Sequence, residues 1–120
     1  MQSDTSTVGV AELSEEELAR YRRQLIMPAV GREGQLRIKR ARVFVAGLGG
    51  LGSISSYYLA AAGIGYMRIV DGDVVDTGNL NRQILHWTGD VGTAKTSSAL
   101  TKLRQLNPHC RIEAVKERME

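Results

Sequence analysis

The stretch Val43-Phe44-Val45-Ala46-Gly47-Leu48-Gly49-Gly50-Leu51-Gly52 decides the fold of this 120-residue chain. Its first four residues form an apolar run typical of a buried parallel strand, so we expect a strand over residues 42–46 that is buried on both faces. The glycines then form a turn that leads into a helical pattern over residues 50–62. Backbone N–H groups at a helix N-terminus attract phosphate, so this arrangement predicts a nucleotide-binding unit.

The segments on both sides of this stretch complete an α/β pattern. Upstream, Ser14 and Glu17 have the spacing of a capping box, which predicts a helix over residues 14–27 and then a short helix over 35–40. Downstream we expect a strand over 66–70, a long loop over 71–92, a helix over 93–106 and a strand over 111–115. The alternation predicts the N-terminal half, about three strands, of a Rossmann-like doubly wound parallel sheet, preceded by an N-terminal helical segment.

Composition and length limit the function classes. We expect a flexible N-terminus over residues 1–13, a helical segment over 14–41 and a nucleotide-binding half-domain over 42–120. No apolar run approaches the roughly 20 residues that a membrane span needs, so we expect no membrane contact and a cytoplasmic location. The formal net charge is +3, but the basic block between residues 20 and 42 lacks the interleaved aromatics of nucleic-acid-binding modules. We therefore expect no nucleic-acid partner.

Acidic and basic residues beyond the glycine turn restrict the class of ligand. Asp71, which follows the strand over 66–70, has the sequence distance from the turn at which an acid reaches ribose hydroxyls. Glycines and Asp71 alone favour an NAD-dependent oxidoreductase. The long loop then supplies Arg82, and Lys95 follows it, and such a cationic pair suits a triphosphate, whose transition-state charge needs fixed cations. These residues favour ATP over a dinucleotide.

Six motifs occur in a characteristic order: Arg20-Tyr21-Arg22-Arg23-Gln24, the glycine turn, Asp71-Gly72-Asp73, Asn79-Leu80-Asn81-Arg82-Gln83, Gly92-Thr93-Ala94-Lys95 and Asn107-Pro108. In this combination the chain resembles the N-terminal part of the ThiF, MoeB and HesA family of adenylating enzymes, within the ubiquitin-activating superfamily. The resemblance covers about residues 12–115.

The resemblance implies an ATP-dependent adenylyltransferase. Its substrate would be a ubiquitin-like sulfur-carrier protein ending in Gly-Gly, whose C-terminal glycine carboxylate attacks the α-phosphate of ATP and expels pyrophosphate. This carboxylate is already ionised at neutral pH, so the reaction requires alignment and charge neutralisation rather than a general base. We accordingly interpret His86 and His109 as structural.

The resemblance also implies roles for individual residues. It implies that Arg23, Arg82 and Lys95 act in catalysis, and that Arg23 enters the ATP site of a second subunit, which makes residues 14–41 a dimer element of a homodimer. It gives Gln83 no assigned role. The residues that it implies in ATP binding are Gly47, Gly49, Gly50, Gly52, Asp71, Asp73, Asn79, Arg82 and Lys95.

Members of this family are longer than 120 residues, so we expect the chain to be a fragment. They carry a Mg²⁺-binding aspartate after the next strand, and often paired zinc cysteines, so the resemblance implies that both metals lie outside this chain. Two alternatives remain. An NAD-binding oxidoreductase domain would bind NADH and not ATP, whereas a non-catalytic nucleotide- or carrier-binding module would bind its carrier regardless of ATP and of Arg82→Ala.

Overall fold

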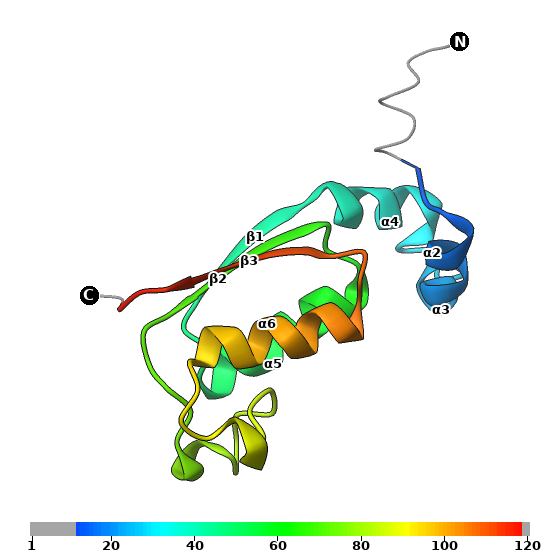
Figure 1. Cartoon of the computed structure of the whole chain (residues 1–120). Helices are drawn as coiled ribbons and strands as arrows, with labels where there is room; N and C mark the ends of the chain where they lie inside the picture. Colours follow the sequence, from blue (N-terminus) through cyan, green and yellow to red (C-terminus); the bar gives the residue numbers. More distant parts are fainter. Residues whose placement is uncertain (1–11, 119–120) are drawn as a thin grey trace.

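The computed structural model, which describes residues 12–118, contains a three-stranded parallel sheet in the order β1-β2-β3. The strands are β1 (Arg42–Ala46), β2 (Tyr66–Asp71) and β3 (Arg111–Lys116). Helices α5 (Gly50–Ala62) and α6 (Lys95–Leu106) connect them and lie on the same face of the sheet (Figure 1). The predicted Rossmann-like α/β fold class is confirmed.

The core lies between the sheet and these two helices. Inward-pointing side chains of alternate strand positions meet the helices there, and each such aliphatic side chain stabilises the fold by about 1.5–3 kcal/mol when buried. Cys110 belongs to this cluster, and burial raises the pKa of its thiol to about 11. The buried members are Val45, Leu48, Ala60, Met67, Ile69, Leu85, Ala99, Leu103, Cys110 and Ile112.

The opposite face of the sheet is open. In one row across it Phe44 pairs with Arg68 and Arg68 with Glu113, Phe44 is 58% exposed, and the Arg68 Nη2 and Glu113 Oε1 atoms are 3.1 Å apart. The prediction that residues 42–46 are buried on both faces is therefore wrong. Parallel strands become buried on both faces when helices cover both, and among residues 12–118 both connecting helices cover the same one.

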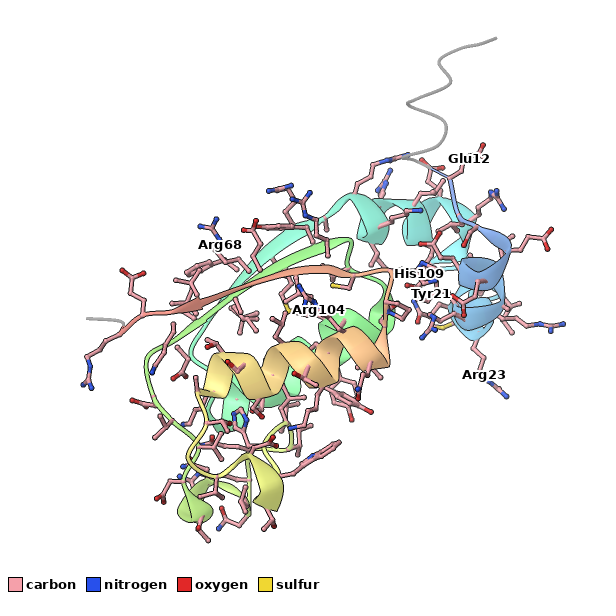
Figure 2. All side chains as sticks on the ribbon, in the orientation of Figure 1. Glu12, Tyr21, Arg23, Arg68, Arg104 and His109 are labelled. Atoms are coloured by element: carbon pink, nitrogen blue, oxygen red, sulfur yellow. The ribbon has the colours of Figure 1, made fainter. Side chains whose placement is uncertain are left out.

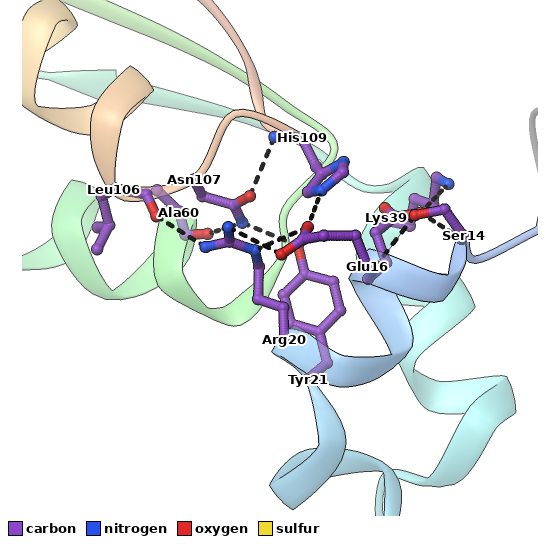
Figure 3. Close-up of polar contacts among 10 residues, drawn as sticks. Ser14, Glu16, Arg20, Tyr21, Lys39, Ala60, Leu106, Asn107 and His109 are labelled. Atoms are coloured by element: carbon purple, nitrogen blue, oxygen red, sulfur yellow. Dashed lines mark hydrogen bonds and ion pairs between the residues drawn. The ribbon is translucent and has the colours of Figure 1, made fainter.

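The N-terminal helical segment consists of α2 (Glu15–Arg20), α3 (Arg22–Leu25) and α4 (Gly31–Arg40). The predicted capping box is confirmed, because the Glu17 N–H donates to Ser14 Oγ at 3.1 Å and the Ser14 N–H donates to Glu17 Oε1 at 2.8 Å. The single helix predicted over 14–27 is wrong, since the chain leaves the helical conformation at Tyr21. The reason is tertiary: Tyr21 is 2% exposed and its hydroxyl accepts a hydrogen bond from Asn107 Nδ2 at 2.8 Å (Figure 3).

Two further boundaries differ from the predictions. Helix α4 begins at Gly31 rather than at residue 35, because Gly31 adopts a φ of 60° that turns the chain directly into the helix. Residues 1–11 of the predicted flexible N-terminus lie outside the described residues, and Leu13 is buried at 6% exposure.

The predicted long loop is held by short local structures. It contains the 3-10 turns η1 (Thr77–Asn79) and η2 (Thr88–Asp90) and a bridge between Val74 and Ala94. Because Ala94 is paired in this bridge, α6 begins at Lys95 instead of residue 93. Within residues 12–118 there is no helix with the length and apolar character needed to cross a membrane.

Candidate functional site

The glycine turn connects the carboxyl end of β1 to the first residue of α5. Gly47 has a φ of 93°, which favours glycine, and its N–H donates to the Val70 carbonyl at 2.7 Å. A Cβ on Gly52 would lie 1.8 Å from the Gly47 carbonyl oxygen, so only glycine fits at that position. Because Gly49 caps α5 without a side-chain hydrogen bond, the first N–H groups of the helix lack a side-chain cap at this turn.

Asp71 holds the turn from the neighbouring strand. It is 7% exposed, and its Oδ2 accepts the Leu48 N–H at 2.7 Å while its Oδ1 accepts the Asp73 N–H at 2.7 Å. A carboxylate has about four acceptor positions, so these bonds leave two of them for another donor. The structure therefore places Asp71 beside the turn, as the sequence predicts, and adds a supporting role that the sequence did not indicate.

A cavity of about 280 Å³ opens at the carboxyl ends of the strands. Gly47, Asp71, Gly72, Asp73 and Arg118 line it. Ligands of open parallel sheets bind at this edge, where strands end and helices begin. Asp73 is exposed here, and its carbonyl oxygen accepts the Lys95 N–H at 3.0 Å.

The segment after η1 lies against the open side of the turn. The Arg82 Cγ is 3.8 Å from the position that a Cβ on Gly50 would occupy, and the Gln83 Nε2 is 3.7 Å from that of Gly49. The Arg82 guanidinium is exposed and its Nη1 donates to the carbonyl oxygen of Gly78 at 3.2 Å. The structure thus brings the predicted Arg82 close to Gly50 and its neighbour Gln83 close to Gly49, two glycines that the resemblance implies in ATP binding.

Gln83 and Asn79 differ in how their amides are used. Asn79 Oδ1 accepts the Asp76 N–H at 2.8 Å, which shapes η1. Gln83 is 4% exposed, and its Oε1 is buried with no hydrogen-bond partner among residues 12–118. A buried amide oxygen without a donor costs free energy, so this atom marks a place where a ligand can supply one.

Lys95 begins α6 and is 6% exposed. Between residues 12 and 118 no carboxylate lies within ion-pair distance of its ammonium group. Its positive charge acts on the buried His86 ring, which itself contacts the glycine turn at Leu48. His86, which the sequence indicated only as structural, therefore lies near Lys95 and is hydrogen-bonded to the turn.

Arg23 is the predicted site residue that the structure does not bring to the turn. It lies on α3 and is exposed, at the amino ends of the strands, and its side chain points away from the sheet (Figure 2). Ala19, Tyr21, Gln24 and Ile26 line a surface hollow with it. Within one chain, Arg23 and the glycine turn are separate.

These features define a Rossmann-type nucleotide-binding α/β protein: a glycine turn between a parallel strand and a helix, an acid at the end of the next strand, and cations on the following loop and helix. The chain belongs to the ThiF family, whose model matches residues 21–120.

Two curated proteins are similar to this chain over most of its length. The chain is 53% identical over 100 residues to the probable adenylyltransferase/sulfurtransferase MoeZ of Mycobacterium tuberculosis, covering 83% of this chain and 26% of that protein. It is 52% identical over 97 residues to the adenylyltransferase and sulfurtransferase uba4 of Aspergillus fumigatus, covering 81% of this chain and 20% of that protein. The chain thus spans about a fifth to a quarter of these curated relatives.

A solved structure shares the fold. The E. coli tRNA N6-threonylcarbamoyladenosine dehydratase TcdA, solved in complex with ATP, is 31% identical, with a TM-score of 0.84 over 90% of this chain and 44% of that chain.

Proposed function

We propose that this chain forms the ATP-binding part of an adenylyltransferase. The observation that carries the proposal is the approach of the aliphatic part of the Arg82 side chain to Gly50, with Cγ 3.8 Å from the position of a Cβ there, at the start of α5, where the N-cap residue makes no side-chain hydrogen bond. Membership of the ThiF family and the ATP complex of TcdA support ATP as the ligand. The adenylyltransferase relatives support the reaction class.

Three buried features fit a nucleotide. The Gly52 position excludes any side chain and keeps the turn close to α5. The buried Gln83 Oε1 has no donor among residues 12–118, so a ribose hydroxyl or an amino group could satisfy it. The remaining acceptor positions of Asp71 suit the ribose hydroxyls, and Asp73 lies at the rim of the same cavity.

The proposed reaction joins a carboxylate to AMP. An oxygen of the C-terminal glycine carboxylate of a ubiquitin-like sulfur carrier forms a bond to the α-phosphorus, and the bond from that phosphorus to the bridging oxygen of pyrophosphate breaks. Negative charge moves onto the leaving pyrophosphate, where Arg82 and Lys95 stabilise it, and the Asn79 Nδ2 is available as a neutral donor. The sulfurtransferase activity in the names of the relatives supports a sulfur carrier as the substrate.

Magnesium is included in this proposal only as the ion that accompanies ATP. Residues 12–118 contain no group of three or more His, Cys, Asp or Glu side chains that could hold a metal ion. We therefore assign no Mg²⁺ or zinc ligand in this part of the chain and derive no step through either metal.

Calorimetry with ATP and with NADH tests the ligand. We expect ATP binding that Arg82→Ala weakens about tenfold or more, because the change removes a charged donor at the phosphates. Arg37→Ala is the matched control, since Arg37 is an exposed arginine on α4 whose only ion pair in the described region is a 3.7 Å contact with Glu33. Binding of NADH without ATP would refute the proposal.

We also propose that Arg23 acts in a homodimer, on the ATP site of the second subunit. Its separation from the turn within one chain supports action between subunits. Arg23→Ala and Arg82→Ala should each abolish carrier-dependent exchange of pyrophosphate into ATP. An equal mixture should regain about a quarter of the activity, because half of the randomly formed dimers contain one intact composite site. No recovery after subunit exchange would show that Arg23 does not act between subunits.

A further inference from the structure

His86 bridges the glycine turn and α6 from the interior of the long loop. Its ring is 2% exposed, with Nε2 at 3.0 Å from the Leu48 carbonyl oxygen and Nδ1 at 2.9 Å from Ser98 Oγ. Leu48 lies within the turn, and Ser98 lies one helical turn after Lys95 on α6. The histidine therefore connects two elements that both face the proposed nucleotide.

The partners of the ring fix its tautomer. A carbonyl oxygen only accepts, so Nε2 carries the proton and donates to Leu48, which leaves the Nδ1 lone pair facing Ser98 Oγ, whose hydroxyl also lies 3.2 Å from the Leu85 carbonyl oxygen. Burial lowers the pKa of His86, and the nearby Lys95 and Lys102 ammonium groups lower it further against the opposing effects of the Leu48 bond and of Asp90. The imidazole is thus neutral at neutral pH and keeps this one donor and one acceptor.

Leu48 is held at both of its backbone polar groups, which belong to two successive peptide units. Asp71 Oδ2 accepts its N–H at 2.7 Å, while its carbonyl oxygen accepts from His86 Nε2 and from Ser53 Oγ, the latter at 3.1 Å. Ser53 belongs to α5, which follows the turn, and Asp71 belongs to the neighbouring strand β2. Among the hydrogen bonds of Leu48 in residues 12–118, that from His86 connects it to the loop that carries Arg82 and, through Ser98, to the helix that carries Lys95.

We infer that His86 is a positioning residue for the nucleotide site: it sets the separation between the N–H groups of the glycine turn and the cations Arg82 and Lys95. The inference rests on the proposed function. Displacement of a positioned group by about 1 Å can cost a hundredfold in rate, so loss of this bridge weakens the site without removing any group that touches ATP.

Three variants of the protein separate positioning from folding. His86→Leu removes both hydrogen bonds, although Ser53 still satisfies the Leu48 carbonyl, so we expect a folded protein. His86→Gln keeps an N–H donor at the position of Nε2, so we expect it to bind ATP nearly as well as the wild type. Leu103→Ala is the matched control, because Leu103 is fully buried on α6 in the core, and its truncation destabilises the fold by about 2–5 kcal/mol without removing a hydrogen bond to the turn.

We expect His86→Leu to weaken ATP binding about tenfold, with His86→Gln within about threefold of wild type and Leu103→Ala unchanged in affinity despite its lower melting temperature. Equal weakening by His86→Leu and Leu103→Ala, or no weakening by His86→Leu, would overturn the inference. If the wild-type protein itself binds no ATP, the proposed function fails instead.

Amide hydrogen exchange then tests the bridge without any nucleotide. His86→Leu should raise the exchange rate of the Leu48 N–H, which donates to Asp71 Oδ2, and His86→Gln should restore slow exchange. Unchanged exchange in His86→Leu would overturn the inference independently of ATP.

Discussion

The two ends of the sheet use buried polar side chains for different purposes. At the carboxyl ends of the strands, Asp71 and His86 hold the backbone of the glycine turn at Leu48. At the amino ends, Tyr21 and Asn107 (Figure 3), together with Gln35, hold the N-terminal helices against the C-terminal end of α5. The carboxyl end of the sheet shapes the proposed ligand-binding surface, and the amino end fixes the N-terminal helices to α5. Changes at the first end should therefore alter nucleotide binding, whereas changes at the second should alter attachment alone.

The largest effect is expected for Gly52→Ala. The added Cβ would lie 1.8 Å from the Gly47 carbonyl oxygen, a backbone atom, so the turn or α5 must shift. We expect destabilisation by more than about 3 kcal/mol and loss of ATP binding, measured by urea unfolding and calorimetry.

Gly89→Ala is the control, because its Cβ would meet no heavy atom within 4 Å. It should change stability by less than about 1 kcal/mol. Normal ATP affinity in Gly52→Ala would show that the turn does not require this close packing.

Asp71→Ala should have the next largest effect. It leaves the N–H groups of Leu48 and Asp73 without their charged acceptor, and we expect a loss of about 2–4 kcal/mol together with weakened ATP binding. Asp71→Asn retains one acceptor oxygen and should fall between Asp71→Ala and wild type. Full stability in Asp71→Ala would contradict the supporting role of this carboxylate.

Asn107→Ala tests the opposite end. Asn107 is fully buried, and its Nδ2 donates to Tyr21 Oη at 2.8 Å and to the Ala60 carbonyl at 2.7 Å. We expect a loss of about 1–3 kcal/mol and faster proteolysis within residues 14–41, with unchanged ATP affinity. Tyr21→Phe, which removes one of these bonds, should lose about 1 kcal/mol. A change in ATP affinity as large as that of Asp71→Ala would remove the distinction between the two ends.

Local sequence signals predicted the element order, the glycine turn and the place of Asp71, because propensity, periodicity and turn chemistry act over short distances. Local signals failed where contacts between residues distant in the sequence determine the structure. The break at Tyr21 depends on Asn107, and the exposure of Phe44 depends on which face the helices cover. His86 could have been noticed as a histidine between the apolar residues Leu85 and Trp87 of the long loop, but its partners Leu48 and Ser98 are distant in sequence.

The smallest expected effect is a dependence of the folding stability on pH, which arises from His86 beside the turn. Because the pKa of folded His86 lies below the ordinary 6.5, the unfolded chain binds the proton first, and stability falls as the pH drops from about 6.5 through the folded pKa. Glu16, Glu17, Asp90 and Glu113 have pKa values lowered from 4.5 or 3.8, so their contributions are lost only at more acidic pH. Urea unfolding of wild type and His86→Gln between pH 7.5 and 5 separates these effects, since His109 is present in both proteins. The two stability curves should converge as the pH falls, because the glutamine side chain introduced by His86→Gln has no proton to bind, and parallel curves would mean that His86 is not held neutral at the turn.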